Sequence, residues 1–139
     1  MVNNKINKFD FIQGGDTLNL NFDSEKPIYL QLAEEIEDAV LSGAYEEEAQ
    51  IPSTTEISVG YKINPATALK GINRLVDDGI IYKKRGLGMF VATGALEKIQ
   101  DKRKETFFEA YIISLVTEAR KLSITKEDIL KMLERGFDK

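Results

Sequence analysis

The chain has 139 residues, of which 42% are hydrophobic and 30% are charged, with a formal net charge of −4. This balance predicts a soluble protein of one domain, or of one domain with an appendage. The absence of cysteine and histidine removes disulfides, the usual zinc ligands and the commonest general base, so we expect no enzyme, no metal and no other cofactor. No apolar run approaches the roughly 20 residues of a membrane span, and the polar N-terminus does not resemble a secretory signal. These features favour a cytoplasmic protein.

The charge is distributed unevenly along the chain. Residues 26–61 contain eight acidic side chains and one basic one, whereas residues 62–85 contain six basic and two acidic side chains. Salt screens charges that lie more than about 8–10 Å apart, so a phosphate backbone responds to the local charge and not to the net charge. The net negative charge therefore does not exclude a nucleic-acid partner.

Residues 1–24 are predicted to form a polar N-terminal extension. Leu18, Leu20 and Phe22 alternate with asparagines, which suggests a short strand. A helix is then predicted to begin at Pro27, where the missing N–H costs nothing, and to end near Gly43. Apolar residues at four-residue steps give this helix a buried stripe, and we interpret the acids on its other face as solvated. The stripe contains Ile28, Leu32, Ile36 and Val40, and the acids are Glu34, Glu35, Glu37 and Asp38.

Two further helices are marked by their N-terminal caps. Ser53 and Glu56 fit a capping box, in which each side chain bonds the backbone amide of the other residue. Asn64 is a second cap, with Pro65 at the first helical position, and Gly79 ends the helix. In this helix we expect Ala68, Leu69, Ile72, Leu75 and Val76 to be buried and Ala66, Thr67, Lys70, Asn73 and Arg74 to be exposed.

Two β-rich runs, residues 80–84 and 88–92, predict a hairpin joined through a glycine-bearing loop. Two short helices followed by a hairpin form a winged helix-turn-helix, so residues 25–94 are predicted to bind DNA. The recognition helix would be residues 65–78, with its N-terminus in the major groove. The hairpin would lie along the DNA backbone or the minor groove. The candidate DNA-binding residues are Ser53, Thr54, Thr55, Asn64, Ala66, Thr67, Lys70, Arg74, Lys83, Lys84, Arg85 and Gly86.

Residues 95–139 are predicted to form a helical dimerisation tail, whose last helix begins with a capping box from Thr125 to Asp128. The tail is too short to enclose a ligand cavity of roughly 300–1,000 Å³ and still fold alone. Its apolar side chains need another surface, and a second copy of the chain is the commonest one. The alternative is that the aromatic residues pack on their own winged-helix domain. The candidate dimerisation residues are Phe107, Phe108, Tyr111, Ile112, Leu115, Ile129, Met132 and Leu133.

From Pro27 to Val91 the sequence resembles the DNA-binding domain of GntR-family bacterial transcription regulators. The matching pieces are Pro27-Ile28-Tyr29 with Gln31, Ile51-Pro52-Ser53, Glu56, Asn64-Pro65 with Thr67, Leu75 with Asp78-Gly79, and Arg85-Gly86 with Gly88 before Phe90-Val91. The resemblance implies a dimer that binds an operator, usually as a repressor. The short tail looks like that of the YtrA-type branch, whose C-terminal part is two helices used for dimerisation.

Three positions depart from the pattern of the family. The family has an arginine, generally a DNA contact, where this chain has Thr55, and it often has asparagine where this chain has Ala66. Glu46-Glu47-Glu48-Ala49-Gln50 replaces a loop that usually carries Pro-Gly. Loss of an arginine that contacts a base is expected to cost about 1–3 kcal/mol per half-site. An acidic loop near the DNA would weaken binding further.

The sequence therefore predicts an α+β, mostly helical protein, with a winged helix-turn-helix domain followed by a C-terminal two-helix dimerisation region. Its predicted function is to bind a near-palindromic operator in double-stranded DNA as a homodimer and to regulate transcription, most simply as a repressor. Two alternatives stay open. One is a winged-helix protein-interaction module with weak or no DNA binding. The other is an effector-gated sensor with a small molecule at the dimer seam.

Overall fold

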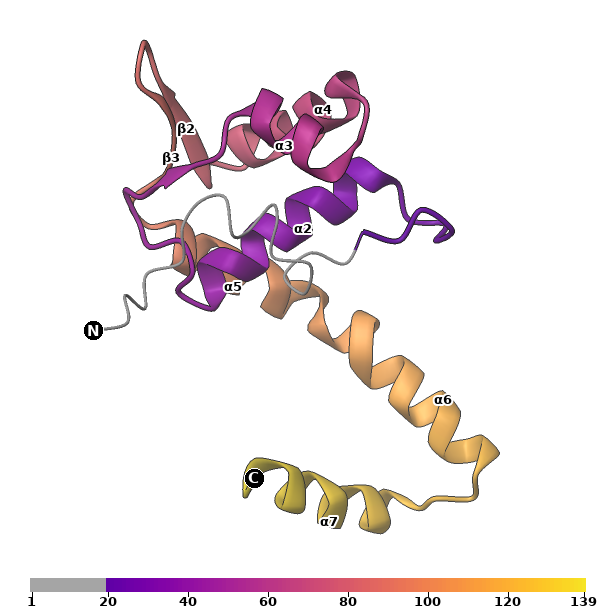
Figure 1. Cartoon of the computed structure of the whole chain (residues 1–139). Helices are drawn as coiled ribbons and strands as arrows, with labels where there is room; N and C mark the ends of the chain where they lie inside the picture. Colours follow the sequence, from indigo (N-terminus) through magenta and orange to yellow (C-terminus); the bar gives the residue numbers. More distant parts are fainter. Residues whose placement is uncertain (1–19) are drawn as a thin grey trace, which may run out of the picture. The chain divides into compact units, whose positions relative to one another are not determined.

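The computed structural model describes residues 20–139 (Figure 1). The chain divides into two compact units, one ending at Gln100 and the other comprising Asp101–Lys139. Leu18 of the predicted strand lies outside the described residues, and residues 20–26 form a turn instead of a strand. The backbone of this segment bonds a side chain and not a neighbouring strand: the Asn21 amide donates to Gln31 Oε1 at 2.7 Å, and Gln31 Nε2 donates to the carbonyls of Asn21 and Lys26.

Helix α2 comprises Ile28–Leu41 and has Pro27 at its N-cap. The predicted stripe is confirmed, since Leu32, Ile36 and Val40 belong to the core. The interpretation of all four acids as solvated is wrong for Glu37, which is only 2% exposed. Figure 1 shows α2 beneath α3 and α4, and Ala95 and Ile99 at the start of α5 belong to the same buried core as α2. Gln31, Ala33 and Ala39 are buried as well, so the buried part of α2 is wider than the aliphatic stripe and includes position 37.

Helices α3 (Thr54–Tyr61) and α4 (Pro65–Asp77) form the helix-turn-helix. Both predicted caps are confirmed: Ser53 Oγ accepts from the Glu56 amide at 3.1 Å, Glu56 Oε1 accepts from the Ser53 amide at 3.0 Å, and Asn64 Oδ1 accepts from the Ala66 amide at 2.8 Å. The chain turns between the helices at Lys62, which has a left-handed conformation with φ of 56°. These local bonds define where α4 begins.

The sheet of the first unit has three antiparallel strands in the order β1-β3-β2. Strands β2 (Ile81–Lys84) and β3 (Gly88–Val91) form the predicted hairpin. Strand β1 (Gln50–Ile51), which the sequence did not indicate, pairs with the other edge of β3. Ile81, Met89 and Val91 are buried in the same core as α2 and α4. The hairpin is therefore anchored in the core at its base, and Gln50 Nε2 donates a hydrogen bond to the Leu87 carbonyl in its loop at 2.9 Å.

The second unit is helical. Helix α5 (Ala95–Phe107) enters it and is followed without a break by the π-helical turn η1 (Phe108–Ile112) and by α6 (Ile113–Lys121). A loop then leads to α7 (Lys126–Phe137), which begins with the predicted capping box of Thr125 and Asp128. Figure 1 shows α6 and α7 diverging from that loop, and Val116 of α6 and Met132 and Leu133 of α7 are exposed.

Candidate nucleic-acid interface

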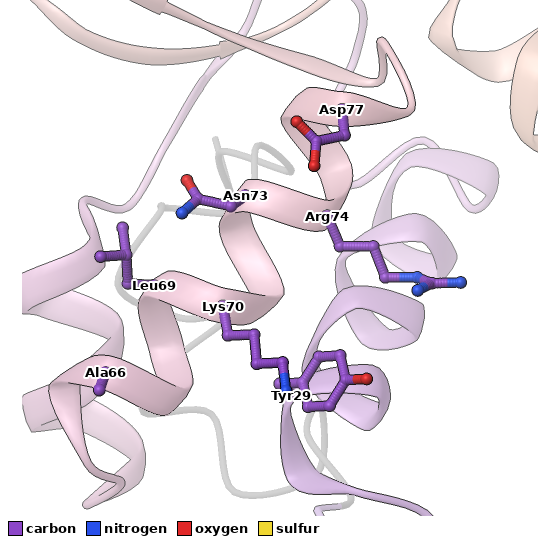
Figure 2. Close-up of a pocket in the computed structure, with 7 residues that line it drawn as sticks. All are labelled: Tyr29, Ala66, Leu69, Lys70, Asn73, Arg74 and Asp77. Carbon is purple, nitrogen blue, oxygen red and sulfur yellow. The ribbon is translucent and has the colours of Figure 1, made fainter.

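The outward face of α4 carries the side chains that the sequence assigned to DNA. Ala66, Lys70 and Arg74 are exposed and Thr67 is half-buried. They line or border a shallow hollow of about 420 Å³. The residues lining the hollow are Tyr29, Ala66, Leu69, Lys70, Asn73, Arg74 and Asp77 (Figure 2). The inward face is buried, with Ala68, Ile72 and Leu75 at 0% exposure.

One residue of α4 was assigned to the wrong face. Leu69 was expected to be buried but is 42% exposed and lines the hollow. It lies three residues after Ala66 and four before Asn73, positions that stand above one another on a helix. It also lies three residues before the buried Ile72, so Leu69 lies at the boundary between the two faces. Asn73 and Tyr29 also line the hollow, although neither was among the candidate DNA-binding residues.

The cations of α4 lie on one edge of this face. Figure 2 shows Lys70 and Arg74 leaving the helix toward α2, whereas Leu69 and Asn73 leave it on the other side. Lys70 Nζ lies 4.2 Å from the centre of the Tyr29 ring, within the range of a cation–π interaction. This contact holds the ammonium group at the surface, where a phosphate can reach it.

The hairpin tip carries the second group of cations. Lys83, Lys84, Arg85 and Gly86 are all exposed. Because side chains alternate along a strand, the two lysines leave opposite faces of the hairpin. Lys84 lies on the face of Tyr82 and Phe90, with its Nζ 5.0 Å from the centre of the Phe90 ring. Those two rings are stacked, with centres 5.9 Å apart. Lys83 lies on the face of the buried Met89, which is its cross-strand partner.

The acidic segment before β1 is bonded to the base of the hairpin. Glu48 accepts hydrogen bonds from the hydroxyls of Tyr82 and Thr93, and Glu47 accepts from the Gly94 and Leu96 amides at 2.9 and 3.1 Å. The hydrogen bond from Thr93, and after it the one from Tyr82, holds the pKa of Glu48 below its ordinary value. The bond between Tyr82 and Glu48 also raises the pKa of Tyr82. Glu47 and Glu48 therefore connect the acidic segment before β1 to the hairpin and to the start of α5.

The candidates at the start of α3 have mainly structural contacts. Ser53 Oγ is occupied by the capping box, and Thr54 beside it is half-buried. Thr55 is exposed, as is the Asn64 cap. The structure thus brings Asn64, Ala66 and Lys70 together along α4, while Thr55 belongs to a separate helix.

Most of the candidate dimerisation residues are apolar side chains that remain exposed in the single chain. Phe107, Phe108 and Tyr111 are each more than half exposed, and the Phe107 and Tyr111 rings are 5.1 Å apart. Met132 and Leu133 of α7 are exposed as well, whereas Ile112, Leu115 and Ile129 are half-buried.

Two classes of site are missing from the part of the chain that the structure describes. Residues 20–139 contain no cluster of three or more histidine, cysteine or acidic side chains that could hold a metal ion. Within the same residues no helix is long and apolar enough to cross a membrane.

Two helices joined by a tight turn, an exposed face on the second helix and a cationic hairpin define a winged helix-turn-helix protein. Residues 28–91 match the model of the bacterial regulatory proteins of the gntR family. The chain is 31% identical over 110 residues to the HTH-type transcriptional regulator YhcF of Bacillus subtilis, an alignment that covers 79% of this chain and 89% of that protein. This chain belongs to the GntR family.

Other relatives agree with this assignment. The chain is 26% identical to the HTH-type transcriptional repressor YtrA of Bacillus subtilis, over 76% of this chain and 81% of that protein. The structure resembles that of a GntR-family regulator from Bacteroides thetaiotaomicron, with a TM-score of 0.64 and 39% identity over 80% of this chain and 96% of that one. It also resembles the AraR DNA-binding domain in complex with the operator ORX1, with a TM-score of 0.50 and 30% identity over 54% of this chain and 96% of that one. The family consists of regulators, which confirms the expectation that the chain is not an enzyme.

Proposed function

We propose that this protein is a sequence-specific regulator of transcription that binds an operator in double-stranded DNA as a homodimer and represses the genes beside it. The observation that carries the proposal is the exposed face of α4, where Lys70 and Arg74 lie along one edge of a shallow hollow that Ala66 also lines. The resemblance to AraR in complex with an operator supports the choice of DNA as the partner.

The proposed docking places the N-terminal half of α4 in the major groove. Ala66 is small enough to let the helix approach the base edges, and Thr67 can bond a base or touch a thymine methyl group. Lys70 and Arg74 lie one and two turns further along, at the edge where phosphate oxygens run. The amides at the start of α4 add a favourable site for a phosphate. Base recognition and backbone attraction thus come from one helix.

The hairpin supplies a second contact with the DNA backbone. In Figure 1 it projects from the side of the first unit on which α3 and α4 lie. Lys83, Lys84 and Arg85 are exposed at its tip, and Gly86 has a φ of 78°, a turn conformation that glycine adopts without strain. The bonds that join Glu48 to Tyr82 and Thr93 keep the acidic loop at the base of the hairpin. The acids therefore do not compete with phosphate at its tip.

The homodimer is proposed because the second unit exposes its apolar side chains. Aromatic and aliphatic residues from η1 to α7 remain open to solvent on a single chain, and monomeric proteins seldom leave large contiguous apolar surfaces uncovered. A second copy related by a two-fold axis would cover them. The two recognition helices would then meet half-sites about 34 Å apart, or at a longer multiple of the DNA helical turn. The likeness to YtrA, which is named a transcriptional repressor, supports the repressor role.

DNA capture with the full-length chain tests the proposed function. Purified protein should enrich discrete genomic fragments that share a near-palindromic motif. The variant Lys83→Ala/Lys84→Ala/Arg85→Ala should lose most of this enrichment. The matched control, Lys126→Ala/Lys131→Ala/Lys139→Ala, removes the same charge from exposed positions of the second unit and should keep it. Equal losses in both variants, or no enriched motif, would contradict the proposal and favour a protein-interaction module.

Sedimentation tests the homodimer. The wild-type chain should sediment as a dimer at micromolar concentration, and Tyr111→Glu should sediment as a monomer. Val59→Glu is the control, because Val59 is 72% exposed on α3, outside the proposed interface. A monomeric wild type would refute the dimer. If a small molecule gates the dimer, it should raise the melting temperature and release the DNA in the same titration.

A further inference from the structure

The exposed face of α4 contains one aliphatic side chain that the folding of the protein does not explain. Ile72 and Leu75 on the same helix are completely buried, whereas Leu69 is 42% exposed. The exposed part of the Leu69 side chain stays in water and gains nothing from folding, unlike the two fully buried side chains. The role of Leu69 is therefore to be sought in what covers this face when the protein binds its partner.

The surroundings of Leu69 are polar and charged. Four polar or charged residues line the hollow with it: Lys70, Asn73, Arg74 and Asp77. The small Ala66 also lines the hollow, and Tyr29 does so on the other side, beside Lys70. A stable protein–protein interface has an apolar centre made of several residues. A single leucine among charged side chains does not provide such a centre. These neighbours fit the surface of a nucleic acid better than that of a protein.

The position of Leu69 on the helix specifies what it would meet. Figure 2 shows Leu69 and Asn73 on the side of α4 opposite to Lys70 and Arg74. If the cations lie along one phosphate backbone, the Leu69 side is turned into the groove. Ala66, one turn earlier, leaves room for close approach. The C5-methyl group of thymine is the apolar feature that base pairs present in the major groove.

We propose that Leu69 is a specificity-determining residue that contacts the C5-methyl group of a thymine in each operator half-site. The inference rests on the proposed DNA-binding function and adds to it one specified contact, with the methyl group of a thymine. Burial of a methyl group against an aliphatic side chain should favour thymine over a base without that group. Leu69 thus selects sequence, while Lys70 and Arg74 supply affinity that does not depend on sequence.

Replacement of thymine by deoxyuridine tests this contact, because it removes the methyl group and keeps the base pairing. A duplex is first selected from a random pool with the full-length wild-type protein. Each thymine of a half-site is then replaced in turn, and the dissociation constant is measured at one salt concentration. At one thymine the wild type should bind about three- to fivefold more weakly, the loss expected for one buried methyl group.

The variants assign the effect to Leu69. Leu69→Ala should bind the thymine duplex more weakly than the wild type does, and should bind the thymine and deoxyuridine duplexes equally. Val59→Ala shortens another exposed aliphatic side chain and should keep the full preference for thymine. A preference that persists in Leu69→Ala, or a wild type that tolerates deoxyuridine at every thymine, would overturn the inference while leaving the DNA-binding function intact. Failure to select any duplex at low salt would contradict the DNA-binding function itself, and the thymine contact with it.

Discussion

Gly71→Ala should destabilise the protein, although alanine is the better helix former. Gly71 lies in the middle of α4 and is buried against α2. A methyl group at this position would lie 2.8 Å from the carbonyl oxygen of Tyr29 and 3.1 Å from Cδ2 of Leu32. The carbonyl belongs to the backbone of α2 and cannot rotate away, so the two helices must move apart.

The magnitude follows from two opposing effects. Alanine in place of glycine favours a helix by about 1 kcal/mol. Insertion of a methyl group into a packed contact costs about 1–3 kcal/mol, and the rigid obstacle places this site in the upper half of that range. The free energy of unfolding should therefore fall by about 1–2 kcal/mol.

Urea unfolding followed by circular dichroism measures this change, read as a lower midpoint at unchanged slope. Gly136→Ala is the matched control. Gly136 also lies in a helix, but a methyl group there would have no heavy atom within 4 Å. This variant should be neutral or more stable by up to about 1 kcal/mol. If Gly71→Ala is as stable as the wild type, α2 and α4 do not approach each other as closely as described.

Three further predictions concern the core, the acidic segment before β1 and the tip of the hairpin. Leu75→Ala should lower the free energy of unfolding by about 2–5 kcal/mol, because Leu75 is fully buried and its loss leaves a cavity; a neutral effect in urea unfolding would mean that the faces of α4 are reversed. The hydrogen bonds of Glu48 depress its folded-state pKa below the ordinary 4.5, so they stabilise the fold above that pH and are lost as the pH falls through the lower value. The urea midpoint of Glu48→Gln should thus depend less on pH below 4.5 than that of the wild type, and parallel profiles would argue against this network. Lys83→Ala/Lys84→Ala/Arg85→Ala should reduce the dependence of log K on log salt by about one unit per lost phosphate contact, and an unchanged slope would show that the hairpin does not touch the DNA backbone.

The capping boxes were predictable from the sequence because their bonds are local. Ser53 with Glu56 and Thr125 with Asp128 join residues three positions apart, so spacing and side-chain type are sufficient to recognise them. The hairpin was predictable for a similar reason, since both of its strands and its turn lie within a short stretch. The Ser53 capping box and the hairpin are parts of the winged helix-turn-helix.

Features that depend on distant residues were not predictable in this way. Strand β1 contains only two residues and exists because β3 pairs with it from about 40 positions away. The bonds of Glu47 and Glu48 reach the hairpin and α5 over comparable separations. Glu37 is buried in a helix whose packing partner, α4, lies about 30 residues further along the chain. No local pattern contains these contacts, so the acids could be interpreted only as solvated or as repelling DNA.

Leu69 shows a different limit. The spacing of apolar residues in α4 predicts which of its faces is buried and which is exposed. Leu69 lies near the boundary between these faces, and its aliphatic side chain favoured the buried one. The structure places it outside. The proposed contacts of α4 and of the hairpin with DNA stay predictions, because they depend on a partner that the sequence does not contain.

The claim that the exposed face of α4 and the hairpin tip bind DNA together is tested most directly by nuclear magnetic resonance. The ¹⁵N-labelled full-length protein would be titrated with a selected operator duplex, and the amide shifts followed residue by residue. The largest changes should fall on residues 64–74 and 83–88, with little change on the acidic positions of α2. Changes confined to α2 or to the second unit, with residues 64–74 unaffected, would contradict the account.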